Sequence, residues 1–235
     1  MMDSAQIALV DRYLFTCLPR EVQRVISLER LAVLGWRDPV SDTPGHKSSA
    51  KRYEHYATRV VAAQLLEAQG AGDAFASRGA DPDRAPQWPP GFVGSITHSA
   101  RFAAVAVMPQ SMARAVGIDA ESVLTADQQV LVRQYCAVDD ELDALARGAS
   151  ALSEAQILTL CFSAKEAVFK CLYPLVKRYF DFTCVRIVAV DESTNLLSIE
   201  VVDKEIARCA ETSALTGSFQ FAEGHVFTAF WLAPR

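Results

Sequence analysis

The order of helical and strand-like segments constrains the fold of this chain more than any other feature. Apolar residues recur at helical spacing in some stretches, and they alternate or run together as in strands in others. The predicted helices are residues 21–34, 49–69, 127–147 and 153–172, and the predicted strands are residues 92–96, 102–108, 115–120, 183–190, 196–202, 218–222 and 226–232. Helices with strands in each half predict an α+β protein that consists of an N-terminal half, residues 1–114, and a C-terminal half, residues 115–235.

Composition and charge argue against several classes of protein. The net charge is −5 and the pI is about 5.4, so the chain has no overall attraction for nucleic acid or for an anionic membrane. The N-terminus has no basic region before a long apolar run, and no stretch of about 20 apolar residues follows it. We therefore expect a cytoplasmic protein with neither a nucleic-acid nor a membrane partner.

Two carboxylates lie two residues apart in the strand-like segment VGIDAE, residues 116–121. In an extended chain Asp119 and Glu121 project to the same side, where their charges repel each other unless a cation lies between them. Oxygen ligands of this kind suit Mg²⁺, which takes one or two carboxylates together with substrate phosphates and water. The alternative is a pair of exposed charges at the end of a strand.

A second charged segment, FSAKEAVFK at residues 162–170, lies on a predicted helix. Glu166 and Lys170 are four residues apart, so they share one face of the helix. Their order favours a surface ion pair worth roughly 0.2–0.5 kcal/mol. The alternative is a solvated charged face over a packed one.

A third segment, GSITHS at residues 94–99, places hydroxyl side chains and a histidine at the end of a strand. Thr97 and His98 can both donate hydrogen bonds to phosphate oxygens there. The alternative is a structural or merely exposed histidine, which is the more common case for a lone one.

In this order, the three segments resemble the signature motifs of the 4′-phosphopantetheinyl transferases, and the Sfp/EntD type is the most similar group. The basic stretch KRYEH at residues 51–55, with Arg59 after it, resembles a helix of the enterobactin-type members. The tripeptide QWP at residues 87–89 is similar too. The resemblance covers residues 50–190. It implies two similar α/β halves about a pseudo-twofold axis, with coenzyme A in the cleft between them.

The same resemblance implies an activity and its partners. Such an enzyme moves the phosphopantetheine arm of coenzyme A to a serine of an apo acyl or peptidyl carrier protein, and it releases adenosine 3′,5′-bisphosphate. It implies a Mg²⁺ ion on the diphosphate of coenzyme A, and a chain that works as a monomer. A fatty-acid carrier, a siderophore peptide carrier and a polyketide carrier all fit.

The resemblance also implies the catalytic groups. Asp119, Glu121 and Glu166 are expected to bind Mg²⁺. Lys170 is expected to contact the phosphate and to stabilise or protonate the leaving nucleotide, and Lys165 to assist in phosphate binding. General chemistry adds that a serine hydroxyl needs a base within reach, for which Glu166, or a metal-bound water held by it, is the candidate. The expected catalytic set is thus Glu166, Lys170 and Asp119.

A second set of residues is implied to hold the nucleotide. Thr97 and His98 are expected to contact its phosphates. Arg52 is expected to hold the 3′-phosphate, with Lys51 or Arg59 as alternatives.

Two other functional classes stay open at this point. The chain can be a catalytically idle module that binds coenzyme A or a carrier protein, although it retains every expected carboxylate and lysine. It can also be a different Mg²⁺-dependent phosphotransferase or a nuclease, although it has no P-loop, kinase or two-metal signature. The stretch KRYF at residues 177–180 is a candidate carrier-docking patch, and a buried aromatic pair with solvated flanks is the alternative.

Overall fold

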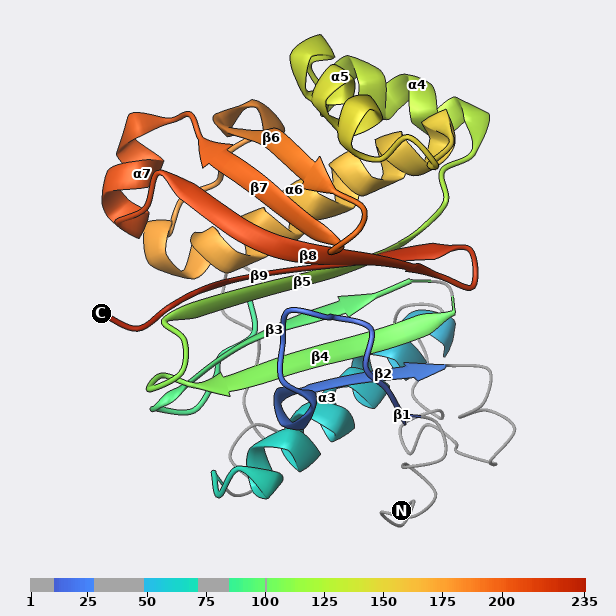
Figure 1. Cartoon of the computed structure of the whole chain (residues 1–235). Coiled ribbons are helices and arrows are strands. Elements are labelled where there is room, and N and C mark those ends of the chain that lie inside the picture. The colour runs from blue at the N-terminus through green and yellow to red at the C-terminus, as the bar shows by residue number, and fades with distance from the viewer. Residues whose placement is uncertain (1–10, 28–48, 72–84, 100) are drawn as a thin grey trace.

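Two antiparallel sheets pack against each other at the centre of the molecule (Figure 1). The structure, a computed structural model, describes residues 11–27, 49–71, 85–99 and 101–235. The N-terminal sheet has the strand order β1 (Asp11–Arg12), β2 (Gln23–Ser27), β4 (Phe102–Pro109) and β3 (Phe92–His98). The C-terminal sheet has the order β5 (Ala115–Ser122), β9 (His225–Leu232), β8 (Ala214–Ala222), β7 (Leu196–Val201) and β6 (Val185–Asp191).

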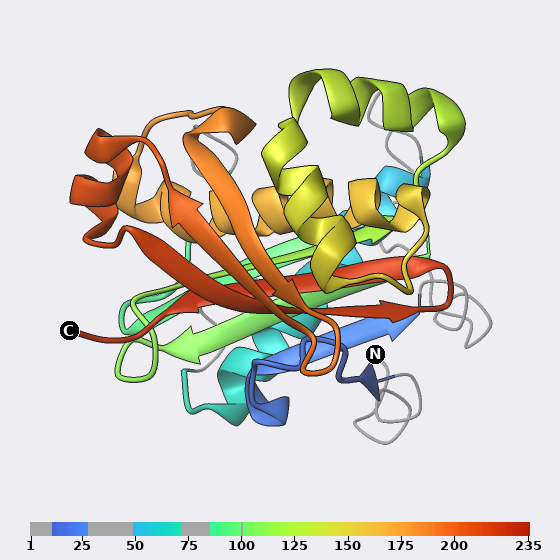
Figure 2. The same ribbon diagram turned by 45° about the horizontal axis from the view of Figure 1, so that its top comes forward.

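Helices cover the outer faces of both sheets, which confirms the predicted α+β class (Figures 1 and 2). The helices are α3 (Ser49–Ala68), α4 (Ala126–Tyr135), α5 (Asp139–Gly148), α6 (Glu154–Val176) and α7 (Lys204–Ala210), with short 3₁₀ turns η1 (Arg20–Val22) and η3 (Phe182–Cys184). Helix α3 packs on the N-terminal sheet and α6 on the C-terminal sheet. Within the described ranges, no helix is both long and apolar enough to cross a membrane.

Strand β5 presents one face to the N-terminal sheet and the other to α6. Val116 and Ile118 are buried between the two sheets, in a cluster that includes Phe102 of β4 and Phe227 of β9. Successive side chains of a strand point to opposite faces, so Asp119 lies on the face that α6 covers. The alternation of β5 therefore directs a carboxylate toward the helix.

The contact between β5 and α6 depends on Gly117. A Cβ atom at this position would lie 1.9 Å from the carbonyl oxygen of Ala167 and 2.5 Å from the backbone nitrogen of Cys171. The backbones of strand and helix thus approach more closely than any side chain permits. On the edge of β5 that does not pair with β9, the backbone N–H of Ile118 donates to Ser95 Oγ of β3 over 3.1 Å. This hydrogen bond joins the two sheets.

The predicted helix over residues 21–34 is wrong where the structure describes it. Gln23–Ser27 is strand β2, which pairs with β1 and β4. Val25 belongs to the core between the sheets, whereas Ile26 belongs to the core under α3. Because β2 is covered on both faces, it lacks the alternation that identifies a half-exposed strand. Residues 28–34 lie outside the described part.

The predicted helix over residues 127–147 is in fact two helices, α4 and α5, which are separated at residues 136–138. Helix α6 continues past Pro174 to Val176, because a proline in the last turn removes only one hydrogen bond of the helix. Helix α7 was not predicted, and β8 begins earlier than expected. The other predicted helices and strands are present with ends shifted by a few residues.

The close approach at Gly117 makes a direct test of this packing possible. We expect Gly117→Ala to lower the free energy of unfolding by about 3 kcal/mol or more, because either the strand or α6 must move. Gly70→Ala is the control: its Cβ meets no atom within 4 Å, and only its φ of 80° adds strain, of about 1 kcal/mol. Urea unfolding of both variants measures the difference, and equal destabilisation would contradict the packing argument.

Candidate active site

Asp119 lies where β3, β5 and α6 meet, with a side chain that is 3% exposed. Lys170 of α6 donates from Nζ to Asp119 Oδ1 over 2.6 Å, and Thr97 of β3 donates from Oγ1 to the same oxygen over 3.0 Å. Lys170 Nζ also lies 3.2 Å from Thr97 Oγ1, which accepts from it. This carboxylate therefore joins a strand of the N-terminal sheet to the helix that covers the C-terminal sheet.

Buried hydroxyl groups hold the second oxygen of Asp119. Ser163 of α6 donates from Oγ to Asp119 Oδ2 over 2.8 Å. Thr228 of β9 lies 2.9 Å from Ser163 Oγ and donates to the backbone carbonyl of Ser163 over 3.0 Å. A carboxylate has about four acceptor positions, and these contacts use three of them. Asp119 thus keeps one position, on Oδ2, for a further ligand.

Two more carboxylates lie beside Asp119 with half-buried side chains. Burial raises the pKa of Glu121 to about 7, with a further increase from the charge of Asp119 and an opposing effect from Lys170. Burial also raises the pKa of Glu166, while Lys170 lowers it and Asp119 raises it. The negative charge of Asp119 therefore disfavours the charged forms of Glu121 and Glu166, and the positive charge of Lys170 opposes this effect at both.

The donor set has the chemistry of a hard-cation site. Asp119, Glu121 and Glu166 offer only oxygen atoms, and their negative charges exceed the one positive charge of Lys170. In the part of the chain that the structure describes, no three Asp, Glu, His or Cys side chains are arranged as a preformed metal site. A cation that takes few protein ligands and fills its shell with phosphate oxygens and water, as Mg²⁺ does, fits this set.

Lys165 lies away from this cluster. Its side chain is 1% exposed, and its ammonium group contacts Glu141 Oε2 of α5 at 2.8 Å. Neighbouring residues of a helix point roughly 100° apart, so Lys165 faces the core while Glu166 faces the cluster. The expectation that Lys165 assists in phosphate binding does not agree with this position.

The residues expected to bind the nucleotide lie on two elements. His98 ends β3, directly after Thr97, and its side chain is exposed. Arg59 is half-buried on α3. Arg52 lies on the same helix, but its side chain falls outside the described part. The nucleotide contacts of these residues stay predictions.

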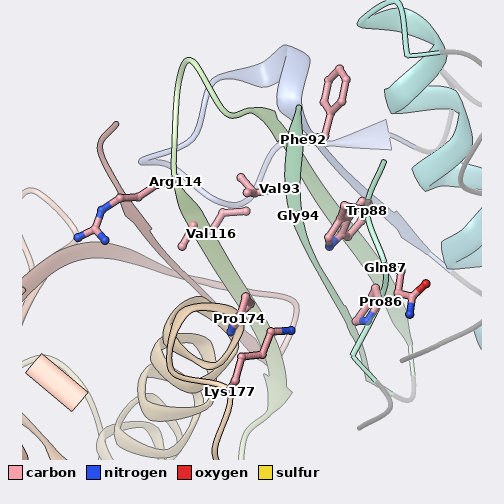
Figure 3. Close-up of a pocket in the computed structure, with 11 residues that line it drawn as sticks. Pro86, Gln87, Trp88, Phe92, Val93, Gly94, Arg114, Val116, Pro174 and Lys177 are labelled. Carbon is pink, nitrogen blue, oxygen red and sulfur yellow. The ribbon is translucent and has the colours of Figure 1, made fainter. Parts of the chain in front are cut away.

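A cavity of about 360 Å³ lies beside the cluster, between β3, the start of β5 and the end of α6 (Figure 3). Pro174 and Lys177 line it, and Pro174 is one helical turn, or roughly 6 Å, along α6 from Lys170. The ring of Trp88 forms part of the opposite wall. It lies so close to Gly94 that a Cβ atom there would be 2.5 Å from Trp88 Cζ2. The glycine of the GSITHS segment thus makes room for this ring.

The stretch at residues 177–180 is not a uniform patch. Tyr179 is 75% exposed, whereas Phe180 is 6% exposed and packs on Phe169 with ring centroids 4.9 Å apart. Arg178 pairs with Asp203 at 3.4 Å, and with Glu205 as well. Of the two aromatic residues predicted for carrier docking, only Tyr179 presents its ring to solvent.

Sequence reasoning did not assign Ser163 and Thr228 to the site. Ser163 precedes Glu166 by three residues on α6, a spacing that places both on one side of the helix and was available as a signal. Thr228 has no signal of its own. It faces Asp119 because β5 pairs with β9 in a register that sets Asp119 opposite Thr228.

Two family models match the chain. Residues 46–108 match the model of the 4′-phosphopantetheinyl transferase N-terminal domain, and residues 115–229 match that of the 4′-phosphopantetheinyl transferase superfamily. The transferase PptT of Mycobacterium tuberculosis is 30% identical over 215 residues, which span 85% of this chain and 92% of that protein. The chain belongs to the 4′-phosphopantetheinyl transferase superfamily.

Other relatives match over shorter stretches. The 4′-phosphopantetheinyl transferase Svp of Streptomyces mobaraensis is 32% identical over 63% of this chain, and the match spans 60% of Svp. Enterobactin synthase component D of Salmonella typhi is 34% identical over 51% of this chain, and the match spans 47% of that protein. The chain therefore covers less than two thirds of the length of these relatives.

The electrostatics of the cluster can be tested by titration. In the wild-type protein, ¹³C NMR of labelled glutamate side chains is expected to show one carboxyl group, Glu121, with a pKa of about 7. Asp119→Asn is expected to lower this pKa because a like charge is removed, and Lys170→Met to raise it. Glu200→Gln, which removes an exposed carboxylate on β7, is the control. If neither substitution changed the pKa of Glu121, this would contradict the proximity of Glu121 to Asp119 and Lys170.

A dependence of stability on pH follows from the same shift. The pKa of Glu121 is higher in the folded protein than its ordinary 4.5, so between pH 4.5 and 7 the folded state binds more protons than the unfolded state. The contribution of Glu121 to the free energy of unfolding therefore falls as the pH rises through this window. Glu121→Gln should remove this contribution and leave the protein more stable than the wild type above pH 7.

Proposed function

We propose that this protein transfers 4′-phosphopantetheine from coenzyme A to a serine hydroxyl of a carrier protein and releases adenosine 3′,5′-bisphosphate. One observation carries the proposal. In a member of the 4′-phosphopantetheinyl transferase superfamily, Asp119, Glu121, Glu166 and Lys170 meet where β3, β5 and α6 come together. Carboxylates for a cation and an ammonium group for phosphate lie side by side there, which is what reaction at a diphosphate needs.

Lys170 and the end of β3 bind the diphosphate in this proposal. Lys170 is partly exposed, so its ammonium group can bind a phosphate oxygen while it remains beside Asp119. Thr97 holds Lys170 in place, and His98 offers a ring nitrogen next to it at the exposed end of the strand. Positive charge at this point stabilises the leaving bisphosphate as the bond between phosphorus and oxygen breaks.

Glu166 is the base for the carrier serine in this proposal. Its half-buried side chain is accessible from the surface, so a carboxylate oxygen can come within hydrogen-bond reach of the hydroxyl group of a docked carrier serine. The serine oxygen forms a new bond to the β-phosphorus, the hydroxyl proton passes to Glu166, and the bond to the bisphosphate breaks. No covalent intermediate on the enzyme is required.

Asp119, Glu121 and Glu166 are the residues that would hold Mg²⁺. When bound there, the ion neutralises charge on the diphosphate and on the three carboxylates. Ser163 and Thr97 keep Asp119 in one orientation, so its free acceptor position points in a fixed direction. A proton on Glu121 competes with the ion, which predicts weaker Mg²⁺ binding below pH 7.

The cavity beside α6 is the proposed place for the adenine of coenzyme A. Trp88 offers an aromatic surface for a base, and a stack of this kind contributes on the order of 1–3 kcal/mol. Arg52 or Arg59 would then hold the 3′-phosphate from the side of α3. In this proposal the N-terminal half, residues 1–114, and the C-terminal half, residues 115–235, supply opposite walls of one cleft.

Partners and setting remain part of the proposal. Because one chain supplies both walls of the proposed cleft, we propose a monomer, and we place it in the cytoplasm, where coenzyme A is available. The relative named enterobactin synthase component D supports a siderophore peptide carrier as the first partner to test, beside fatty-acid and polyketide carriers.

A mass-shift assay tests the transfer. The protein is incubated with coenzyme A, Mg²⁺ and a panel of apo carriers, and intact mass spectrometry is expected to show one phosphopantetheine on one carrier. EDTA is expected to abolish the shift, and Asp119→Ala to slow it by about 100-fold or more. Glu200→Gln, which changes an exposed carboxylate on β7, should keep the wild-type rate. No transfer to any carrier by a protein that binds coenzyme A would favour a binding module.

The role of Glu166 has a separate test. Glu166→Gln keeps the size and an oxygen ligand but removes the base, so we expect kcat to fall by about 100-fold at saturating Mg²⁺ and coenzyme A. The remaining activity should also lose its increase with pH on the acid side. A turnover close to the wild-type value would contradict the assignment of Glu166 as the base.

A further inference from the structure

A buried ion pair contains Lys165, the residue before Glu166 on α6, and takes no part in the proposed chemistry. Lys165 Nζ donates to Glu141 Oε2 over 2.8 Å, to the carbonyl oxygen of Cys136 over 2.8 Å and to that of Phe182 over 3.1 Å. The side chains of Lys165 and Glu141 are 1% and 0% exposed. The ammonium group therefore has three acceptors for its three N–H bonds.

Glu141 is equally well bound. Its Oε1 accepts from the backbone N–H of Ile187 over 2.7 Å, and its Oε2 accepts from the backbone N–H of Val138 over 3.1 Å in addition to Lys165. These contacts come from the first strand after α6 and from the residue before α5. The ion pair thus has no unsatisfied donor, and its geometry is specified on every side.

The ion pair joins four segments at one point. Cys136 is the last residue of the turn that ends α4, Glu141 lies on α5, Phe182 opens η3, and Ile187 lies on β6. Lys165 of α6 bonds directly to Cys136, Glu141 and Phe182, and Ile187 is joined to it through Glu141.

The pair does not need to be there for packing alone. Desolvation of two charges is costly, and apolar side chains of similar volume often replace such a pair without loss of stability. A lysine with three directed hydrogen bonds instead restricts the helix to one rotation about its axis and one position along that axis. Glu166 is the next residue along α6, so the position of its carboxylate depends on the rotation and position of this helix.

We propose that Lys165 is a positioning residue that fixes α6 through Glu141 and so holds Glu166 at its working position. The inference rests on the proposed function, because it assigns Lys165 a role in the transfer reaction. Most of the cavity proposed for coenzyme A is lined by β3, the start of β5 and Trp88, and α6 with its C-cap residue adds only Lys170, Pro174 and Lys177, so substrate binding depends on the pair less than turnover does. Its loss should therefore lower kcat more than it raises the KM for coenzyme A.

The test uses a variant that removes both charges at once. In Lys165→Met/Glu141→Gln, no buried charge is left unpaired, and the amide oxygen of the new side chain can still accept from Ile187. The control is Leu215→Ala, which opens the core of the C-terminal sheet on β8, an element that takes no part in the hydrogen bonds described above for the pair. Both variants are assayed for phosphopantetheine transfer well below their unfolding temperatures, and kcat and KM are determined separately.

We expect the double variant to show a kcat about tenfold or more below that of Leu215→Ala, with a KM for coenzyme A within about twofold. A kcat equal to that of the control would overturn the proposal and leave the pair a purely structural one. If the wild-type protein itself transfers nothing, the proposed function fails and the inference with it. If the wild-type protein is active and the double variant matches the control, only the positioning role of Lys165 fails and the proposed function stands.

A second variant covers the case in which the double variant does not fold. Glu141→Asp keeps both charges and the two carbonyl partners of Lys165, and it only shortens the acceptor side chain, so no buried charge is left unpaired. We expect a smaller loss of kcat in the same direction, again with little change in KM. An unchanged kcat in this variant would overturn the proposal.

Discussion

The hydrogen bonds of Asp119 tie the chemistry of this protein to its fold. Burial of a carboxylate costs free energy unless charged and polar groups bind it. Asp119 accepts hydrogen bonds from Lys170 and Ser163 of α6 and from Thr97 of β3. The same contacts hold the two sheets and the helix together. Gly117, two residues earlier, lets α6 come close enough for these bonds to form. The site therefore exists only when the layers are in register.

Local spacing predicted the parts of the site that lie on one element. Asp119 and Glu121 project from one face of β5, and Glu166 and Lys170 lie on neighbouring turns of α6. The ion pair of Lys170 with Asp119 joins residues 51 positions apart, so no local pattern contains it. For the same reason the sequence did not predict the position of Lys165, because its partner Glu141 lies on another helix. It did not predict strand β2 either, because Val25 and Ile26 pack into two different cores.

The arrangement also bears on the competing functions. A module that only binds coenzyme A needs cations for the phosphates, but it has no need for Glu121 and Glu166, both with a raised pKa, beside Asp119 and a lysine. A nuclease or another phosphotransferase would suit such a cluster, but the match to the 4′-phosphopantetheinyl transferase superfamily argues for a different substrate. The cluster and the family together favour transfer from coenzyme A over either alternative.

The central claim is that Asp119, Glu121 and Glu166 bind one divalent cation together with the diphosphate of coenzyme A. A crystal of the protein with coenzyme A and Mn²⁺ in place of Mg²⁺, measured at a wavelength where manganese scatters anomalously, locates the cation directly. The account predicts a single anomalous peak within ligand distance of these carboxylates and of the diphosphate. A cation bound by the diphosphate alone, or coenzyme A bound away from Lys170, would contradict it.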